Sequence, residues 1–329
     1  MVILMYDVAA SSGGAASILY NFYKKCVEDK ENQYVFVVSS IELSECDNVR
    51  VIAYPWIKKS MVHRYFFELF CAAQLVKKIN PDKIFSLQNT TILFCDPNIQ
   101  TIYMHQSLPF SSIKFSLFDQ PKLWFKQNIL GCIIRKSIRK CEKVIVQTNW
   151  IKEACAELCK VPRDHFIVED PPKIEVLTMY ENPSNPYLFY PANGNKYKNH
   201  EVLIKALTSF KREHSFCPHT VFTISQEMGN YAKSIIDLSK QNQLDIEFVG
   251  EISRKRVWEL YKRSILVFPS YLETLGLPLL EARYANAPIL ASDMPFSREV
   301  LNGYGNASFF SYDDSEALKK LIEVQYLED

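Results

Sequence analysis

The chain has 329 residues, of which 48% are hydrophobic and 23% are charged, and its formal net charge is +1. This length allows two domains of ordinary size, and the composition is typical of a globular protein. A net charge so close to zero gives no overall field that would attract nucleic acid, so we expect no nucleic-acid partner. The nine cysteines lack metal-type spacing, and free thiols in a reducing cytosol are the expected account of them.

The first half of the chain alternates between short apolar runs and longer helical segments. Strands are predicted at residues 2–6, 34–38, 49–53, 83–86, 100–104 and 143–147. Helices are predicted around residues 17–30, 60–79 and 122–141. Such alternation predicts a parallel sheet with helical crossovers, which is an α/β fold. No stretch approaches the ~20 apolar residues of a membrane span, and the N-terminus is typical of a strand and not of a signal peptide.

Two features of this half are candidate ligand contacts. Gly13 and Gly14 lead from the first predicted strand into a helix, but they do not form the GxGxxG fingerprint of dinucleotide-binding proteins. His105 directly follows the strand that ends at Met104, and ligands bind at the carboxyl edge of open α/β sheets. Each feature alone also fits a simple turn or a structural histidine.

Residues 56–78 and 110–143 combine an excess of basic residues with interleaved aromatic residues. This composition suits the surface of an anionic membrane. The alternative is that the aromatic side chains are core and the lysines form a solvated face. We expect a cytoplasmic protein, and the first interpretation places it peripherally on the inner face of the plasma membrane.

Residues 170–186 have the proline and polar density of a linker. A second alternating unit follows, with strands predicted near residues 187–190, 219–224, 245–249, 265–268 and 288–291. We therefore divide the chain into a domain of residues 1–180, a domain of residues 181–312 and a C-terminal helix of residues 313–329. The first domain is a candidate packing surface for that helix.

The stretch of residues 268–282 predicts an anion site. An apolar strand leads into a loop with Gly276, and Pro278 suits the first turn of a helix that begins near Leu277. The free N–H groups and the positive dipole end of this helix would point at whatever lies in front of Gly276. Because glycine has no side chain, a ligand can approach the backbone closely there.

Two glutamates flank this anion site. Glu273 precedes the predicted helix and Glu281 falls near its first turn. Carboxylates accept hydrogen bonds from hydroxyl groups, so an anion site with acceptors on both sides suits a sugar diphosphate. The alternative is a capped helix with two solvated glutamates.

The same stretch resembles the signature of family-4 retaining glycosyltransferases of group 1. That signature has two glutamates separated by seven residues, with a glycine between them, after a strand that ends in Pro-Ser; here these are Glu273, Glu281 and Gly276. The resemblance covers most of the chain, is strongest over residues 187–300, and points to enzymes of bacterial surface-polysaccharide synthesis. It implies the GT-B architecture, in which two Rossmann-like domains face each other across a cleft. The first domain would bind the acceptor and the second the nucleotide sugar.

The resemblance also implies roles for individual residues. Glu273 would hold hydroxyls of the donor sugar, His105 would orient the acceptor or the donor sugar, and Gly14 would let the backbone approach the donor phosphates. The implied catalytic residues are Glu273, His105 and Lys198. The implied donor-binding residues are Gly14, Asn193, Lys198, Thr274, Leu275, Gly276, Leu277 and Glu281, with backbone N–H groups offered by 274–276 and ribose hydroxyls bound by Glu281.

One position departs from the family pattern. The family neutralises the donor diphosphate with an arginine and a lysine, and the lysine position is Lys198, which would open the next helix. The arginine position is Asn193, which can donate a hydrogen bond but carries no charge. Lys196 is the candidate for the missing cation. Residues 247–252 resemble the segment whose main chain holds the nucleobase.

The implied reaction transfers a hexose from a nucleotide sugar to a glycan or polyprenyl-linked acceptor with retention at the anomeric carbon. We expect no metal and no other cofactor, since the sequence lacks an Asp-x-Asp pair of the kind that metal-dependent glycosyltransferases use. Two alternatives stay open. One is a nucleotide-sugar epimerase on the same architecture, and the other is a non-catalytic nucleotide-sugar-binding partner subunit, which Asn193 favours.

Overall fold

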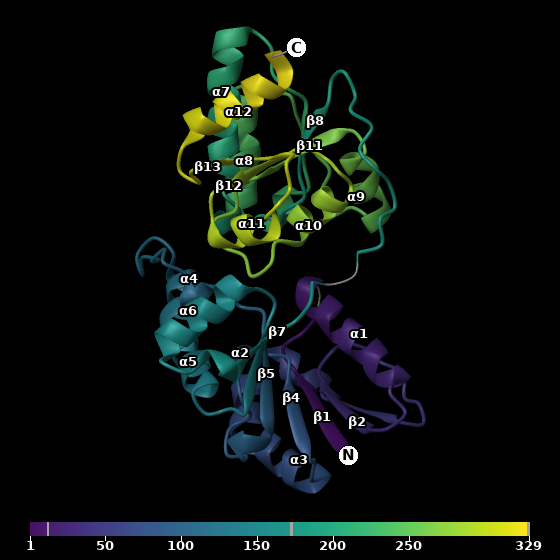
Figure 1. The fold of residues 1–329 in the computed structure, drawn as a ribbon. Coiled ribbons are helices and arrows are strands. Elements are labelled where there is room, and N and C mark those ends of the chain that lie inside the picture. The colour runs from purple at the N-terminus through teal and green to yellow at the C-terminus, as the bar shows by residue number, and fades with distance from the viewer. Residues whose placement is uncertain (12, 172–173, 328–329) are drawn as a thin grey trace. The chain divides into compact units, whose positions relative to one another are not determined.

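The computed structural model describes residues 1–11, 13–171 and 174–327. The chain divides into two compact units, Met1–Asp170 and Pro171–Asp329, and each is built on a parallel sheet with flanking helices (Figure 1). The predicted α/β fold with two Rossmann-like domains is confirmed. In the described part of the chain, no helix is both long enough and apolar enough to cross a membrane.

The first unit has a seven-stranded sheet in the order β3-β2-β1-β4-β5-β6-β7. Its strands are β1 Val2–Asp7, β2 Gln33–Val38, β3 Val49–Ala53, β4 Lys83–Ser86, β5 Gln100–Met104, β6 Lys143–Val146 and β7 Phe166–Val168. The sequence predicted all of these except β7, a three-residue strand at the edge of the sheet.

The first unit has six α-helices in its described part, and π-helical turns separate two pairs of them. They are α1 Gly13–Glu28, α2 Met61–Phe66, α3 Ala72–Ile79, α4 Pro121–Phe125, α5 Gly131–Ile138 and α6 Asn149–Cys159. The two long helices predicted from the sequence are each broken by a π-helical turn, Phe67–Cys71 between α2 and α3 and Lys126–Leu130 between α4 and α5. The Gly13–Gly14 pair lies inside the first turn of α1, and not in a loop before it.

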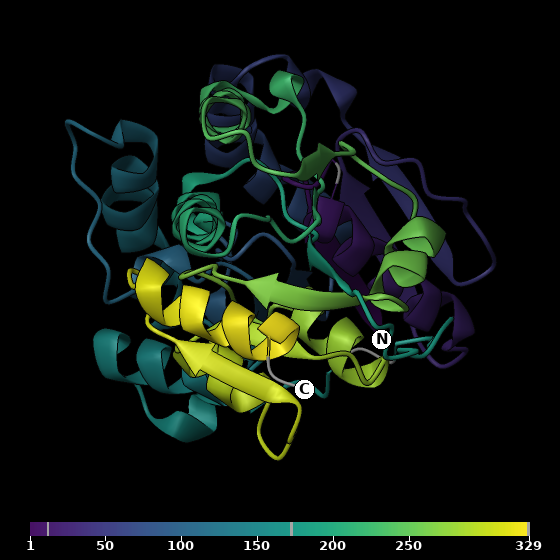
Figure 2. The ribbon, with the colours of Figure 1, turned by 90° about the horizontal axis from the view of Figure 1, so that it is seen from above.

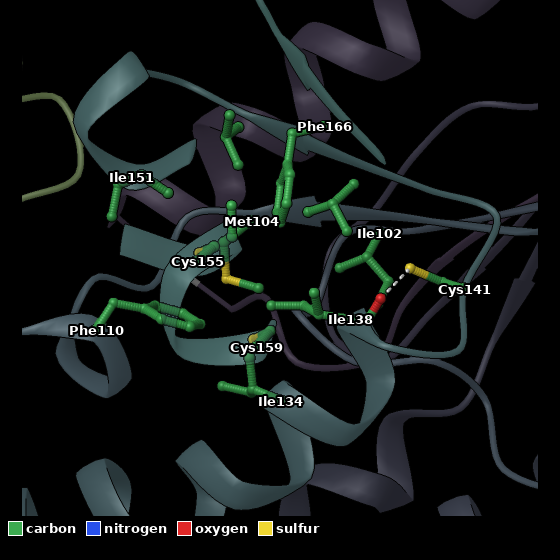
Figure 3. Close-up of a cluster of buried hydrophobic side chains, with 13 residues drawn as sticks. Ile102, Met104, Phe110, Ile134, Ile138, Cys141, Ile151, Cys155, Cys159 and Phe166 are labelled. Atoms are coloured by element: carbon green, nitrogen blue, oxygen red, sulfur yellow. Dashed lines mark hydrogen bonds between the residues drawn. The ribbon is translucent and has the colours of Figure 1, made fainter. Parts of the chain in front are cut away.

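Alternate residues of β1, an interior strand of this sheet, face different helices, because side chains alternate along a strand. Met5 packs in one apolar cluster with Leu19 of α1, while Leu4 packs in another with Val76 of α3. A third cluster places α5 and α6 against β5 and β6, and its labelled members include three buried cysteines (Figure 3). Burial raises the pKa of these thiols, that of Cys141 to about 12 and that of Cys159 to about 11, as expected for inert core cysteines.

The second unit has a six-stranded sheet in the order β10-β9-β8-β11-β12-β13. Its strands are β8 Tyr187–Tyr190, β9 Thr220–Phe222, β10 Ile246–Phe248, β11 Ser264–Phe268, β12 Ile289–Ser292 and β13 Ala307–Phe310. Its helices are α7 His200–His214, α8 Asn230–Gln241, α9 Arg254–Tyr261, α10 Leu277–Tyr284, α11 Pro295–Val300 and α12 Ser315–Leu327. The sequence predicted five of the six strands and missed only the edge strand β13.

The predicted C-terminal helix corresponds to α12, which packs along α7 within the second unit (Figures 1 and 2). Lys319 of α12 forms an ion pair of 2.6 Å with Glu213 of α7 across this contact. Residues 328–329, at the end of the helix expected here, lie outside the described residues.

The predicted linker belongs largely to the second unit. Thr178 Oγ1 donates to Trp258 O at 2.8 Å, and Tyr180 N donates to Ala285 O at 2.7 Å. These bonds explain why the structure divides at Asp170, earlier than the boundary at residue 180 that we expected. Residues 172–173 of the linker lie outside the described residues.

Candidate active site

The candidate active site begins where the strand order of the second sheet reverses. From β8, strands continue through β9 to β10 on one side, and through β11 to β13 on the other. Ligands of open parallel sheets bind beyond the carboxyl ends of the strands at such a switch point. The chain that leaves β8 carries Lys198, and the chain that leaves β11 carries Glu273.

The structure brings these two predicted residues into direct contact. Lys198 Nζ lies 2.5 Å from Glu273 Oε1, and the two side chains are only 13% and 16% exposed. Ser270 Oγ donates to the same carboxylate oxygen at 2.7 Å, and Lys198 Nζ also lies 5.8 Å from the centre of the Phe268 ring. The result is a largely buried ion pair with a hydroxyl group and an aromatic ring beside it.

Two further hydrogen bonds hold this pair in place, one between the two loops and one from the end of β8 to the loop that follows it. Tyr271 N donates to Tyr197 O at 3.1 Å, and Tyr190 OH donates to Lys198 O at 2.7 Å. Lys198 ends a short 3-10 turn, Lys196–Lys198, and does not open α7 as we expected. The reason is Asn199, whose φ of 59° is left-handed and separates the turn from the helix.

The predicted start of α10 at Leu277 is confirmed. Gly276 caps the helix with a φ of 77°, a conformation that favours glycine, and a Cβ added there would lie 3.1 Å from Leu279 Cδ1. Thr274 is half-buried, and the Leu275 side chain is buried in the core while that of Leu277 is exposed. Leu275 can therefore meet a ligand only through its backbone.

Glu281 is the fifth residue of α10, and its two carboxylate oxygens have different partners. Arg254 Nη1 lies 3.1 Å from Oε1, and Tyr261 OH donates to Oε2 at 3.3 Å. Burial raises the pKa of Glu281 above its usual range, while Arg254 and Tyr261 act in the opposite direction.

The position that departs from the family pattern is exposed. Asn193 and Lys196 both have exposed side chains, and Asn193 Oδ1 accepts a hydrogen bond of 2.6 Å from Asn195 Nδ2. Lys196 forms no ion pair with any residue that the structure describes. Its role in place of the family arginine stays a prediction.

His105 and Gly14 lie in the first unit. Asn89 Oδ1 accepts from the His105 backbone N–H at 2.8 Å, so the Asn89 amide Nδ2 must be the donor to the imidazole Nε2 at 3.3 Å. The ring proton of neutral His105 is then on Nδ1, which is buried and has no partner among the described residues. Burial lowers the pKa of His105 to about 4, so the ring is uncharged at neutral pH.

Gly14 has open space at its Cα. A Cβ added there would meet no described atom within 4 Å. Packing within the unit therefore gives no reason for a glycine at this position, and close approach of a ligand stays the predicted reason.

Several polar contacts made by the predicted residues within each unit were not predicted from the sequence. They involve Ser270, Tyr197, Asn89, Arg254 and Tyr261. Asn89 could have been found, because it follows β4 at the same sheet edge as His105. Arg254 has a weaker signal: it is a basic residue in the first turn of a helix, where acidic residues are favoured.

One group of side chains in the described residues has a spacing that could hold a metal, namely Glu213, His214 and Glu323. It lies at the opposite end of α7 from Lys198. The ammonium of Lys319 lies 2.6 Å from Glu213 and 3.6 Å from Glu323, so a protein cation already balances these carboxylates.

The sequence of residues 180–329 matches the family of Glycosyl transferases group 1. Residues 180–329 therefore form a group 1 glycosyltransferase domain. The chain is 24% identical over 278 residues to the O-antigen chain mannosyltransferase RfbU of Salmonella typhimurium, a match that covers 80% of this chain and 71% of that protein. The predicted relationship to bacterial surface-polysaccharide enzymes is confirmed.

Solved structures share the fold of the glycosyltransferase. WaaG, a glycosyltransferase involved in lipopolysaccharide biosynthesis, has a TM-score of 0.71 at 12% identity, over 100% of this chain and 91% of that chain. Anabaena Alr3699/HepE, solved in complex with UDP and glucose, has a TM-score of 0.69 at 14% identity, over 100% and 90% of the two chains. The predicted GT-B fold is confirmed.

Proposed function

We propose that this glycosyltransferase moves a hexose from a nucleoside diphosphate sugar to a hydroxyl of a glycan or polyprenyl-linked acceptor, with retention at the anomeric carbon. The observation that carries the proposal is the Lys198–Glu273 pair at the switch point, between β8 and the start of α10. The names of the relatives support mannose and glucose as the first sugars to test.

In the proposed reaction, Lys198 and the first-turn N–H groups of α10 stabilise the diphosphate as it leaves. The bond between the anomeric carbon and the phosphate oxygen breaks. The acceptor oxygen forms its bond on the same face, and its proton passes to the leaving phosphate oxygen. Glu273 holds the sugar hydroxyls, and neither a covalent nucleophile nor a metal takes part.

The family resemblance gives the remaining predicted residues further roles in this step. Glu281 would accept hydrogen bonds from the ribose hydroxyls, and Gly14 would allow the backbone to approach the phosphates. His105, which is neutral at pH 7, would orient the acceptor or the donor sugar as a hydrogen-bonding group and not as a charge.

Two measurements test the proposal. A thermal-shift screen with UDP, GDP and dTDP identifies the nucleotide, because a ligand that binds the native state raises its melting temperature. Nucleotide release from the matching mannose and glucose donors is then followed with and without a polyprenyl-linked glycan. We expect release that depends on the acceptor, and a product whose anomeric configuration, determined by NMR, matches that of the donor.

The two alternatives give different results in the same assay. An epimerase converts one nucleotide sugar into another without an acceptor and without nucleotide release. A non-catalytic subunit binds the nucleotide and releases none. Either result would replace the proposed function.

We also propose that the enzyme attaches peripherally to an anionic membrane through its first unit, on the cytoplasmic side. The face of α2 and the following π-helical turn exposes six large apolar side chains: Met61, Val62, Tyr65, Phe66, Leu69 and Phe70. Phe118 is 93% exposed, and exposed lysines accompany both segments. Other aromatic residues of these segments, including Phe67, Phe110 and Phe115, are buried, so the core interpretation holds for part of each.

A further inference from the structure

The first turn of α9 contains three consecutive basic residues, Arg254, Lys255 and Arg256. Positive charge there opposes the helix dipole, so the local helix gives no reason for it. Arg256 forms an ion pair of 3.0 Å with Glu259, three residues further along the same helix. Arg254 instead leaves its helix and reaches Glu281 of α10 at 3.1 Å, which identifies a contact between two helices as the reason for its position.

Glu281 needs such a partner because its side chain is only 10% exposed. A carboxylate removed from water loses solvation, and it stays charged only with compensating partners. From α9, Arg254 faces one oxygen and Tyr261 the other.

The other elements packed against Glu281 contribute no charge to it. On α10, Arg283 donates to Val300 O, and on α11, Arg298 pairs with Asp293 at 2.7 Å. The strands β11 and β12 contain no ionisable residue. Arg254 is therefore the one cation directed at this carboxylate in the described part of the chain.

The remaining acceptor capacity of Glu281 matches a vicinal diol. A carboxylate has about four lone-pair positions, two on each oxygen. The donors from Arg254 and Tyr261 use one position on each oxygen, which leaves each oxygen able to accept from one further hydroxyl. A ribose carries two adjacent hydroxyls, whereas a 2′-deoxyribose carries one.

We propose that Arg254 is a positioning residue that orients Glu281 and maintains its negative charge, so that the carboxylate binds both ribose hydroxyls and selects ribonucleoside over 2′-deoxyribonucleoside diphosphates. This inference rests on the proposed function, because it assigns Glu281 to the nucleotide. Arg254 acts through Glu281, and its own side chain need not touch the ligand.

The test compares Arg254→Gln with the matched variant Arg256→Gln, which removes the same charge from the same turn. Calorimetry uses UDP or GDP, whichever binds the wild type more tightly, at about pH 6 and about pH 8.5. Without Arg254, burial of Glu281 is less opposed, its pKa rises, and its neutral fraction grows as the pH falls. We expect the dissociation constant of Arg254→Gln to rise about tenfold at the lower pH and less at the higher pH.

The controls make this pattern specific. The ionisation of the nucleotide itself cancels when each variant is divided by the wild type at the same pH. Arg256→Gln should bind as the wild type does at both pH values, and Arg254→Lys should restore most of the affinity. For the wild type, the 2′-deoxy nucleotide should bind more weakly than the ribonucleotide, and Glu281→Gln should abolish most of this difference.

Two results would overturn the inference at different levels. If Arg254→Gln and Arg256→Gln behave alike at both pH values while Glu281→Gln weakens binding, Arg254 has no positioning role and the proposed ribose site stands. If Glu281→Gln binds the ribonucleotide as tightly as the wild type, the assignment of Glu281 within the proposed function is itself wrong.

Discussion

Lys198 and Glu273 form a 2.5 Å ion pair between the loops that follow β8 and β11, and both side chains are largely shielded from water. Removing one partner of such a pair leaves the other charge without compensation in a site of low polarity. The family resemblance gives these residues separate roles, on the diphosphate and on the sugar. The structure shows that the two side chains pair directly with each other.

The first prediction concerns that pairing. Lys198→Ala should weaken binding of the free nucleoside diphosphate by about 10–100-fold and lower turnover, because hydrogen bonds to charged groups contribute ~1.5–3 kcal/mol. Glu273→Ala should leave Lys198 available to the phosphates, so affinity for the diphosphate should be unchanged or tighter while turnover falls. The double variant should deviate from additivity by ~1–3 kcal/mol. Calorimetry and product formation at saturating donor measure these effects.

Lys196→Ala is the control for the phosphate site. If Lys196 replaces the family arginine, this variant also loses diphosphate affinity, and if it does not, it binds as the wild type does. Wild-type affinity together with wild-type turnover in Lys198→Ala would show that the phosphate site has been misplaced.

The second prediction concerns the cap of α10. Gly276→Ala should weaken nucleotide binding, because the φ of 77° disfavours any side chain and the new Cβ would press on Leu279 at 3.1 Å. Gly303→Ala is the matched control, since Gly303 has a φ of 73° but no atom within 4 Å of an added Cβ. Both variants should lose ~1–2 kcal/mol of stability from the backbone alone, and only Gly276→Ala should lose affinity. Equal nucleotide affinities in the two variants would contradict the role of this helix terminus.

The third prediction concerns acid stability. His200 is fully buried against Tyr190 and Phe222, and neither ring nitrogen has a partner among the described residues. Burial lowers the pKa of His200 to about 3, whereas an unfolded histidine has a pKa of about 6.5. The unfolded chain therefore binds a proton that the native chain excludes, and stability falls as the pH drops from about 6.5 toward 3.

The substitution His200→Phe should remove this loss of stability at low pH and keep the aromatic packing. At about pH 5, His200 lowers the free energy of unfolding of the wild type by an amount on the order of 2 kcal/mol. The melting temperature of His200→Phe should therefore fall less between pH 7.5 and pH 5 than that of the wild type. Parallel loss of melting temperature in the two proteins would show that His200 does not contribute to acid sensitivity.

The fourth prediction concerns the membrane. The combined substitution Phe66→Ser and Phe70→Ser should reduce flotation with anionic vesicles at low salt, because both side chains are more than half exposed on the face of α2 and the π-helical turn that follows it. Leu158→Ser on α6, which is also exposed in the same unit, is the control and should float as the wild type does. Equal flotation of the wild type with anionic and neutral vesicles would refute the attachment.

Local patterns in the sequence allowed most elements of the fold to be predicted. The four apolar residues of β11, Ile265 to Phe268, and Pro278 in the first turn of α10 are local signals of this kind. The edge strands β7 and β13 were missed, although predicted strands such as β9 are no longer than they are. The π-helical turn at Phe67–Cys71 depends on packing that a helical period does not reveal.

The candidate site was predicted by residue type but not by pairing. Lys198 meets Glu273 because β8 and β11 are neighbours in the sheet, and strand order is not encoded in either loop. The contact of Arg254 with Glu281 likewise depends on how α9 and α10 pack on the sheet. Motif spacing therefore identified the carboxylates and the lysine, and only the tertiary structure identified their partners.

The hydrogen bonds of Thr178 and Tyr180 also determine where the chain can be cut. The two units are contiguous in sequence, so a single break separates them. A recombinant fragment that starts at Pro171 retains both bonds, whereas one that starts at Glu181 deletes them and leaves the carbonyl groups of Trp258 and Ala285 without these donors. For isotope labelling of the second unit alone, the expression boundary belongs at Pro171.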